Sequence, residues 1–167
     1  MPNPTPILKK MGRKRRGNPV HGWVAVDKDI GLTSTQVVGR VRRIFNAQKA
    51  GHAGTLDPLA TGVLPIALGE ATKTVPYVMD GAKVYRFTAC FGEARDTDDL
   101  EGRVIATSQV RPDDSEIRVA LPAFTGTVLQ VPPVYSAIKI DGQRSYKKAR
   151  DGNGELPPAR NVEISRF

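Results

Sequence analysis

Residues 51–62 of the chain read GHAGTLDPLATG, and they are followed at once by VLPIAL, residues 63–68. The first stretch holds three glycines, so we predict a loop whose backbone adopts conformations closed to other residues and lets a ligand approach closely. Pro58 biases Asp57 towards an extended conformation, which can hold its carboxylate at a fixed angle. The second stretch is apolar throughout, which is typical of a short buried strand. The segment therefore predicts an accessible carboxylate beside a core strand.

The residues around Asp57 also allow a purely structural interpretation. An aspartate in a turn commonly accepts a hydrogen bond from its own backbone, as an Asx turn. Local physics by itself favours this second interpretation.

The flanking stretches predict a sheet and several helices. Thr33 and Gln36 have capping-box spacing and predict a helix start. The apolar stripe of that helix is formed by Val37, Val38, Val41, Ile44 and Phe45. We predict further helices over 70–80, from Asp113 or Asp114, and over 145–150. Predicted strands are 21–27, 63–68, 84–91, 125–131 and 134–140, with a hairpin turn at Asp141-Gly142 and a last strand at the chain end.

The irregular alternation of these elements favours an α+β domain around one mixed sheet. Residues 1–18 contain three prolines and six lysines or arginines, and no acidic residue precedes Asp27. We expect this basic segment to be a disordered tail and residues 19–167 to form the domain. Because residues 164–167 resemble a strand, we expect the sequence to be part of a longer protein.

The charge balance favours a polyanionic partner. The chain has 25 Lys and Arg against 17 Asp and Glu, a formal charge of +8 and a pI near 9.9. Lysines and arginines that replace counterions around phosphates gain affinity for nucleic acid without reading its sequence. Many soluble basic proteins bind no particular partner, so a solvated basic face remains the alternative for Arg40, Arg42 and Arg43.

Several classes of protein and site are excluded or unsupported. Cys90 is the only cysteine, which rules out an intrachain disulfide and a thiolate zinc site. No apolar run approaches the ~20 residues of a membrane span, and no signal peptide is recognisable. We expect a cytoplasmic monomer with no metal site and no membrane association.

A resemblance to a known family changes the interpretation of Asp57. The stretch GHAGTLDPLATGVLPIALGEATK, residues 51–73, closely resembles the central motif of the TruB family, the bacterial enzymes that convert uridine 55 in the T-arm of tRNA to pseudouridine. Lys83-Val84-Tyr85 resembles the second motif of that family. Further matches are Gly92, Asp96-Thr97, Asp99, Gly102, Pro133 to Lys139, Gly142, Tyr146, Ala149 and Arg150.

The resemblance implies a pseudouridine-synthase fold, with a central mixed, mostly antiparallel sheet flanked by helices. It implies that Asp57 is the catalytic aspartate, that Tyr85 stacks on the uracil, and that His52 and Asp96 contact the extruded nucleotides. The structural alternatives are a core aromatic for Tyr85, an exposed loop residue for His52 and a surface carboxylate for Asp96. The resemblance also implies tRNA as the partner, through its T-arm stem-loop, and no cofactor. Residues that help to build the site under this interpretation are Lys28, Tyr135 and Lys139.

This chain departs from the family pattern at two positions. Asp29 stands where the family usually has proline, and Arg95 where it usually has threonine. The second half of the family supplies an arginine that pairs with the aspartate, more of the uracil pocket and an RNA-binding module of the PUA type, none of which falls in this sequence. The rival hypotheses are an RNA-folding protein, a ribosome-associated basic domain and a guide-dependent pseudouridine synthase.

Overall fold

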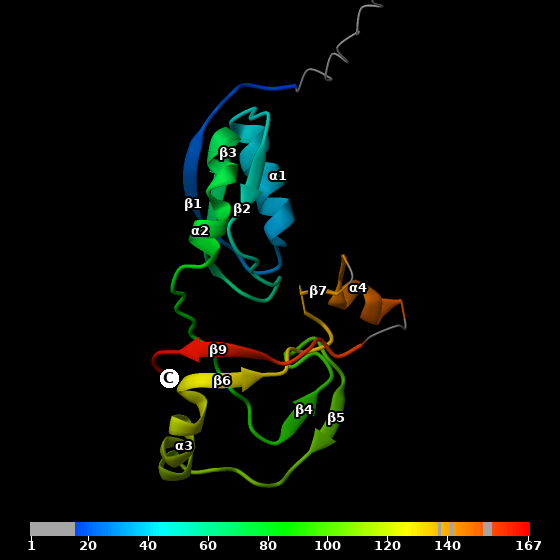
Figure 1. The fold of residues 1–167 in the computed structure, drawn as a ribbon. Helices are drawn as coiled ribbons and strands as arrows, with labels where there is room; N and C mark the ends of the chain where they lie inside the picture. Colours follow the sequence, from blue (N-terminus) through cyan, green and yellow to red (C-terminus); the bar gives the residue numbers. More distant parts are fainter. Residues whose placement is uncertain (1–15, 137, 141, 152–154) are drawn as a thin grey trace, which may run out of the picture. The chain divides into compact units, whose positions relative to one another are not determined.

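The computed structural model describes residues 16–136, 138–140, 142–151 and 155–167, and it divides into two compact units (Figure 1). The N-terminal unit ends at Val84, and the C-terminal unit runs from Tyr85 to Phe167. Residues 1–15 of the predicted tail lie outside the described residues, as do Ala137, Asp141 and 152–154.

The N-terminal unit is a three-stranded antiparallel sheet with one long helix, α1. In sequence order its elements are β1 (Gly22–Lys28), α1 (Ser34–Ile44), β2 (Ala50–His52), β3 (Gly62–Leu68), the 3₁₀ helix η1 (Gly69–Lys73) and α2 (Val75–Met79). The strand order is β1-β3-β2, so the strand after the glycine-rich loop is central. The predicted first strand and the strand over 63–68 are confirmed, whereas the sequence did not predict β2.

Helix α1 begins as the capping-box spacing predicts. The Thr33 hydroxyl accepts from the Gln36 amide at 3.2 Å, and the Gln36 side chain accepts from the Thr33 amide at 2.8 Å. The single helix predicted over 70–80 is wrong, because it is divided between η1 and α2. Pro76 lies in the first turn of α2, where its missing N–H leaves no intrahelical bond unmade, and a new helix therefore starts there.

The core of this unit lies between α1 and the inner face of the sheet. Val37 and Val41 of α1 pack against Leu64, Ile66 and Leu68 of β3. The predicted apolar stripe of α1 is thus confirmed at its centre. Its last members are not buried: Ile44 is 79% exposed and Phe45 is 42% exposed.

The C-terminal unit consists of antiparallel strand pairs and short helices. Its elements are β4 (Glu93–Arg95), β5 (Val104–Thr107), α3 (Asp114–Ala120), the 3₁₀ helix η2 (Leu121–Phe124), β6 (Gly126–Gln130), β7 (Lys139–Ile140), β8 (Gln143–Arg144), α4 (Ser145–Arg150) and β9 (Arg160–Ile164). The pairs are β4-β5, β6-β9 and β7-β8. Figure 1 shows β6 and β9 side by side, with α3 near the start of β6. The predictions of α3, β6 and α4 are confirmed. The last strand predicted over 164–167 lies earlier in the chain, because β9 ends at Ile164 and residues 165–167 form no strand.

Two predicted strands are wrong. Residues 84–91 form no strand, and among the described residues of 134–140 only Lys139–Ile140 form a strand. Alternating apolar residues predict a strand, but a strand forms only where a neighbouring backbone accepts its hydrogen bonds. Tyr85 and Phe87 are 69% and 66% exposed, although the edge of the Phe87 ring meets Phe167 at a centroid distance of 5.8 Å.

The α+β class is confirmed, and the described strands are divided among four antiparallel sheets rather than gathered in one. Within the described ranges, no helix has the length and apolar character needed to cross a membrane.

Candidate active site

The loop between β2 and β3 is attached to the core at its beginning. Ala53 is buried, and its amide donates to the Pro65 carbonyl at 2.9 Å. Gly54 follows with φ +104°, a conformation that disfavours any side chain. Leu56 then turns back to pack against the core. The loop therefore reaches Asp57 along a fixed path.

Ser34, the first residue of α1, holds the residue before Asp57 from both sides. Its hydroxyl donates to the Leu56 carbonyl at 3.0 Å and accepts from the Leu56 amide at 2.9 Å. The Ser34 residue is only 3% exposed, so water does not compete for these bonds. The residue after Asp57 is held as well, because the Gly31 amide donates to the Pro58 carbonyl at 2.7 Å.

The Asp57 side chain itself is exposed and accepts no hydrogen bond from any residue in the described part of the chain. The turn that follows uses the backbone instead: the Ala60 amide donates to the Asp57 carbonyl at 3.0 Å. The Asx-turn interpretation is therefore wrong, and the carboxylate is available to a ligand.

Lys28 stabilises the turn before α1, which in turn supports this loop. It is 1% exposed, and its Nζ donates to the carbonyls of Asp29 and Leu32 at 3.0 and 2.8 Å. A buried ammonium requires such partners. Lys28 thereby closes the turn that carries Gly31 and leads into Ser34, and its role is structural. Asp29, where the family usually has proline, offers its carbonyl to this lysine.

His52 ends β2 at the start of the same loop and is half-buried. Its Nδ1 lies 2.5 Å from the Gly54 carbonyl. A carbonyl can only accept, so Nδ1 carries the hydrogen, and in the neutral ring Nε2 is left as an acceptor. His52, at the end of β2, and Asp57, in the loop that follows, belong to the same unit.

Tyr85 is the first residue of the C-terminal unit. Its ring is exposed and lies in an extended segment outside any sheet. The interpretation as a core aromatic is wrong, because the residue is largely open to solvent.

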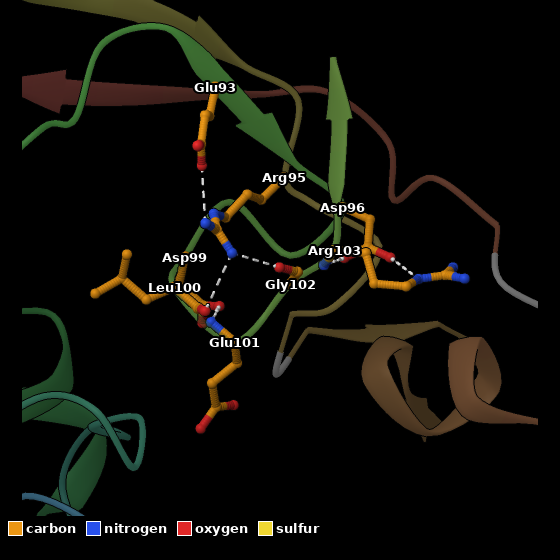
Figure 2. Close-up of polar contacts among 8 residues, drawn as sticks. All are labelled: Glu93, Arg95, Asp96, Asp99, Leu100, Glu101, Gly102 and Arg103. Atoms are coloured by element: carbon orange, nitrogen blue, oxygen red, sulfur yellow. Dashed lines mark hydrogen bonds and ion pairs between the residues drawn. The ribbon is translucent and has the colours of Figure 1, made fainter. Parts of the chain in front are cut away.

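Asp96 follows β4 in a loop whose carboxylates and guanidinium groups bind one another (Figure 2). Its Oδ1 accepts from the Arg103 amide at 2.9 Å and its Oδ2 from Arg103 Nε at 3.2 Å. The Asp96 side chain is 22% exposed. Both oxygens of Asp96 therefore already have a partner. This favours a structural role for Asp96, in contrast to Asp57.

The Arg95 side chain forms hydrogen bonds within the same loop, as Figure 2 shows. One of its terminal nitrogens donates to the Gly102 carbonyl at 2.8 Å and to the Leu100 carbonyl at 3.4 Å, and the other pairs with Glu93 at 2.8 Å. The departure from threonine at this position thus adds a brace across the hairpin between β4 and β5. Two further residues are assigned to the site by the resemblance. Tyr135 is 40% exposed, and Lys139 lies in β7.

The predicted site residues are divided between the two units, with Asp57 and His52 in the first and Tyr85 and Asp96 in the second. Among the residues that the structure describes, no group of three or more His, Cys, Asp or Glu side chains could hold a metal ion.

Sequence reasoning missed Ser34 and Gly31. A signal for Ser34 was present, because Ser34, Val37 and Val41 share the buried side of α1. A hydroxyl on a buried helix face needs a partner, and such a residue next to a glycine-rich loop is a candidate anchor. Gly31 makes this contact through its backbone amide, a group that every residue except proline carries, so the residue type gave no signal for the contact.

Comparisons with known proteins agree on one family. Residues 42–167 match the family described as TruB family pseudouridylate synthase (N terminal domain). A tRNA pseudouridine synthase B of Gluconacetobacter diazotrophicus is 61% identical over 155 residues, covering 93% of this chain and 51% of the relative. The enzyme of the same name from Bradyrhizobium diazoefficiens is 64% identical, covering 92% of this chain and 45% of the relative.

One solved structure, a Cbf5–Nop10–Gar1 complex, contains a chain with 26% identity and a TM-score of 0.51 over 85% of this chain and 33% of that chain. The present chain spans about half the length of the curated relatives it matches.

Proposed function

The chain belongs to the TruB family of pseudouridylate synthases, and we propose that residues 19–167 form the N-terminal part of a catalytic domain that converts the T-arm uridine of tRNA to pseudouridine. One observation carries the proposal: the Asp57 carboxylate is exposed and has no hydrogen-bond partner among the described residues, while the backbone on both sides of it is fixed. A protein that only folds or escorts RNA has no use for a carboxylate held in this way.

The chemistry suits a single carboxylate. The bond between uracil N1 and ribose C1′ breaks, the base turns, and C5 bonds to C1′; C5 then loses its hydrogen as a proton, and N1 gains one. A carboxylate can attack C1′, add to the uracil ring or remove a ribose proton on a glycal route, and each course needs an accessible oxygen at a set position. Because no atom is oxidised or lost, we propose that no metal or organic cofactor takes part.

The other assigned residues would bind the substrate. His52, which presents Nε2 as an acceptor, would contact the nucleotide next to the target, and the exposed Tyr85 ring would stack on the uracil. Asp96 would touch extruded bases through the part of its carboxylate that Arg103 leaves accessible. Removing a uridine from a folded loop costs a few kcal/mol, which phosphate contacts would offset. A tRNA substrate implies a cytoplasmic site of action.

Release of tritium from a T-arm-containing tRNA transcript labelled at uracil C5 tests the proposal directly, because C5 loses its hydrogen only when pseudouridine forms. The wild-type chain should release tritium, and Asp57→Asn should not. Asp80→Asn is the matched control, since Asp80 is another exposed aspartate of the same unit, at the end of α2, and should behave as wild type.

Equal release from wild type and Asp57→Asn would contradict the assignment of the aspartate. Silence from the chain, followed by silence from the same sequence extended to the length of its relatives, would contradict the activity. An RNA-folding protein would keep its RNA affinity in Asp57→Asn and release no tritium in either form. A ribosome-associated domain would show no preference for tRNA.

A further inference from the structure

The positive charge of the chain is concentrated in its first third. Residues 1–56 hold 11 lysines and arginines and only two acids, Asp27 and Asp29, whereas residues 57–167 hold 14 against 15. The formal charge of +8 therefore comes entirely from the first 56 residues. We propose that the C-terminal end of α1 and the chain segment docked beside it form a binding surface for the phosphate backbone of the RNA stem, separate from the Asp57 loop; this inference rests on the proposed function.

The arginines of α1 are free to bind an anion. Arg40, Arg42 and Arg43 are all exposed, and none forms an ion pair with a described acidic residue. Arg42 Nε donates to the Ala47 carbonyl at 3.1 Å, which holds that guanidinium group at the helix end. Arg40 and Arg43 lie about one turn apart and line an open hollow together with the exposed Ile44.

The tertiary structure brings residues 16–18 to this same place. Asn18 forms a parallel bridge with Ala47, directly after α1: its amide donates to the Asn46 carbonyl at 2.6 Å, and its carbonyl accepts from the Gln48 amide at 3.0 Å. Gln48 Nε2 also donates to the Gly17 carbonyl at 2.9 Å. A Cβ on Gly17 would lie 2.5 Å from the Asn46 carbonyl oxygen, so this close approach requires glycine.

The result is one basic surface from two sequence regions. Arg16 is exposed and immediately precedes Gly17. In the sequence it follows Lys9, Lys10, Arg13, Lys14 and Arg15. No acid lies between residues 30 and 56, so nothing in α1 or the following loop neutralises this charge. A surface of this kind gains affinity for a polyanion by releasing its counterions.

The length of α1 places this surface relative to the reaction. Ser34, which anchors the Asp57 loop, and Ile44, beside the arginines, are the two ends of the helix. Ten residues of helix span about 15 Å, a distance that covers several base pairs of an RNA stem. RNA that lies along α1 with its target uridine at Asp57 would therefore meet the arginines with stem phosphates rather than loop bases.

The salt dependence of RNA binding tests the surface. Dissociation constants of the full chain would be measured between about 50 and 200 mM salt for two RNAs, a T-arm hairpin with its complete stem and an oligonucleotide of the loop alone. The variants are Arg40→Gln with Arg43→Gln, and Arg118→Gln with Arg166→Gln, which removes the same charge from exposed arginines of the other unit. Arg40→Lys with Arg43→Lys keeps the charge.

The α1 pair should lower the slope of log K against log salt by about 2 on the full hairpin and change little on the loop alone. The lysine pair should keep most of the slope, and the control pair should leave it as in wild type. The proposed surface would be overturned if the two glutamine pairs lowered the salt slope equally, or if the α1 pair lowered it equally on both RNAs. Either result would leave the isomerase proposal intact. A wild-type chain that binds neither RNA would overturn the surface, and the isomerase proposal would fall only if the sequence extended to the length of its relatives also released no tritium.

Discussion

Two aspartates in this chain follow short strands and lie in turns, yet their surroundings are opposite. Asp57 has an exposed carboxylate without a partner, on a backbone fixed by Ser34 and Gly31. Asp96 has a carboxylate bound through both oxygens to Arg103, in a loop that Arg95 braces from within. In the first loop the rest of the protein positions the backbone and leaves the side chain free; in the second the side chain itself holds the turn.

The comparison indicates which carboxylate can do chemistry. Buried anchors on the residues beside Asp57 fix its backbone and leave its carboxylate oxygens accessible to a substrate. A carboxylate that already accepts two charge-assisted or backbone bonds contributes first to structure.

The largest difference should come from neutralising each aspartate in turn. Asp57→Asn should lower the rate of tritium release by about a thousandfold or more, because the reacting group itself is lost. Asp96→Asn should raise KM a few-fold and leave kcat within about threefold, because the amide can replace only part of the contact with Arg103. Single-turnover measurements of tritium release separate the effect on kcat from the effect on KM. Comparable losses of kcat in Asp57→Asn and Asp96→Asn would contradict the difference between the two aspartates.

The anchor of the first loop can be removed without touching Asp57. Ser34→Ala removes the partner of the partly buried Leu56 amide and carbonyl, so the free energy of unfolding should fall by about 1–3 kcal/mol. A carboxylate misplaced by about 1 Å can cost up to a hundredfold in kcat, with KM little changed. Urea denaturation and kinetics would measure both effects. Thr35→Ala, an exposed neighbour on α1, is the control. Unchanged kcat in a folded Ser34→Ala protein would show that the anchor does not position Asp57.

The brace of the second loop offers a smaller test. Arg95→Thr removes the bonds to the Gly102 and Leu100 carbonyls and the pair with Glu93. Amide hydrogen exchange in residues 96–103 should become faster, and RNA affinity should fall by a few-fold at most, since the loop keeps the Asp96–Arg103 contact. Exchange that stays at the wild-type rate would mean that Arg95 is not needed to order the hairpin.

The smallest effect concerns the cap of α3. The Asp113 carboxylate accepts from the Ser115 hydroxyl and from the Ser115 and Glu116 amides, and these bonds lower its pKa from 3.8. Because folding lowers the pKa, the stabilisation is complete above pH about 4 and is lost as the pH falls through the lowered value. Asp113→Ala should therefore lower the melting temperature at neutral pH, and the difference from wild type should shrink in acid. A pH-independent difference would contradict the role of the charge.

Much of the first unit could be predicted from sequence because its signals are local. The capping box of Thr33 and Gln36, the valines one turn apart in α1 and the apolar run over 63–68 specify their own elements. Residues 84–91 show the limit, since their alternation is equally regular and yet they pair with no strand among the described residues. The split at Thr74 was missed although Pro76 marks a helix boundary within the pattern. The strand β2 was missed because three residues give too short a pattern.

The sequence by itself determined the family, the α+β class and the candidate aspartate, because these depend on residue types at fixed spacings along one short stretch. Only the tertiary structure decided that Asp57 accepts no side-chain hydrogen bond from any described residue, that Ser34 and Gly31 hold its loop, that Asp96 is bound to Arg103, and that Asn18 pairs with the chain at the end of α1. The physical reason is that these contacts join residues brought together by the packing of α1 and the folding of the chain, and several use backbone groups, which every residue carries alike.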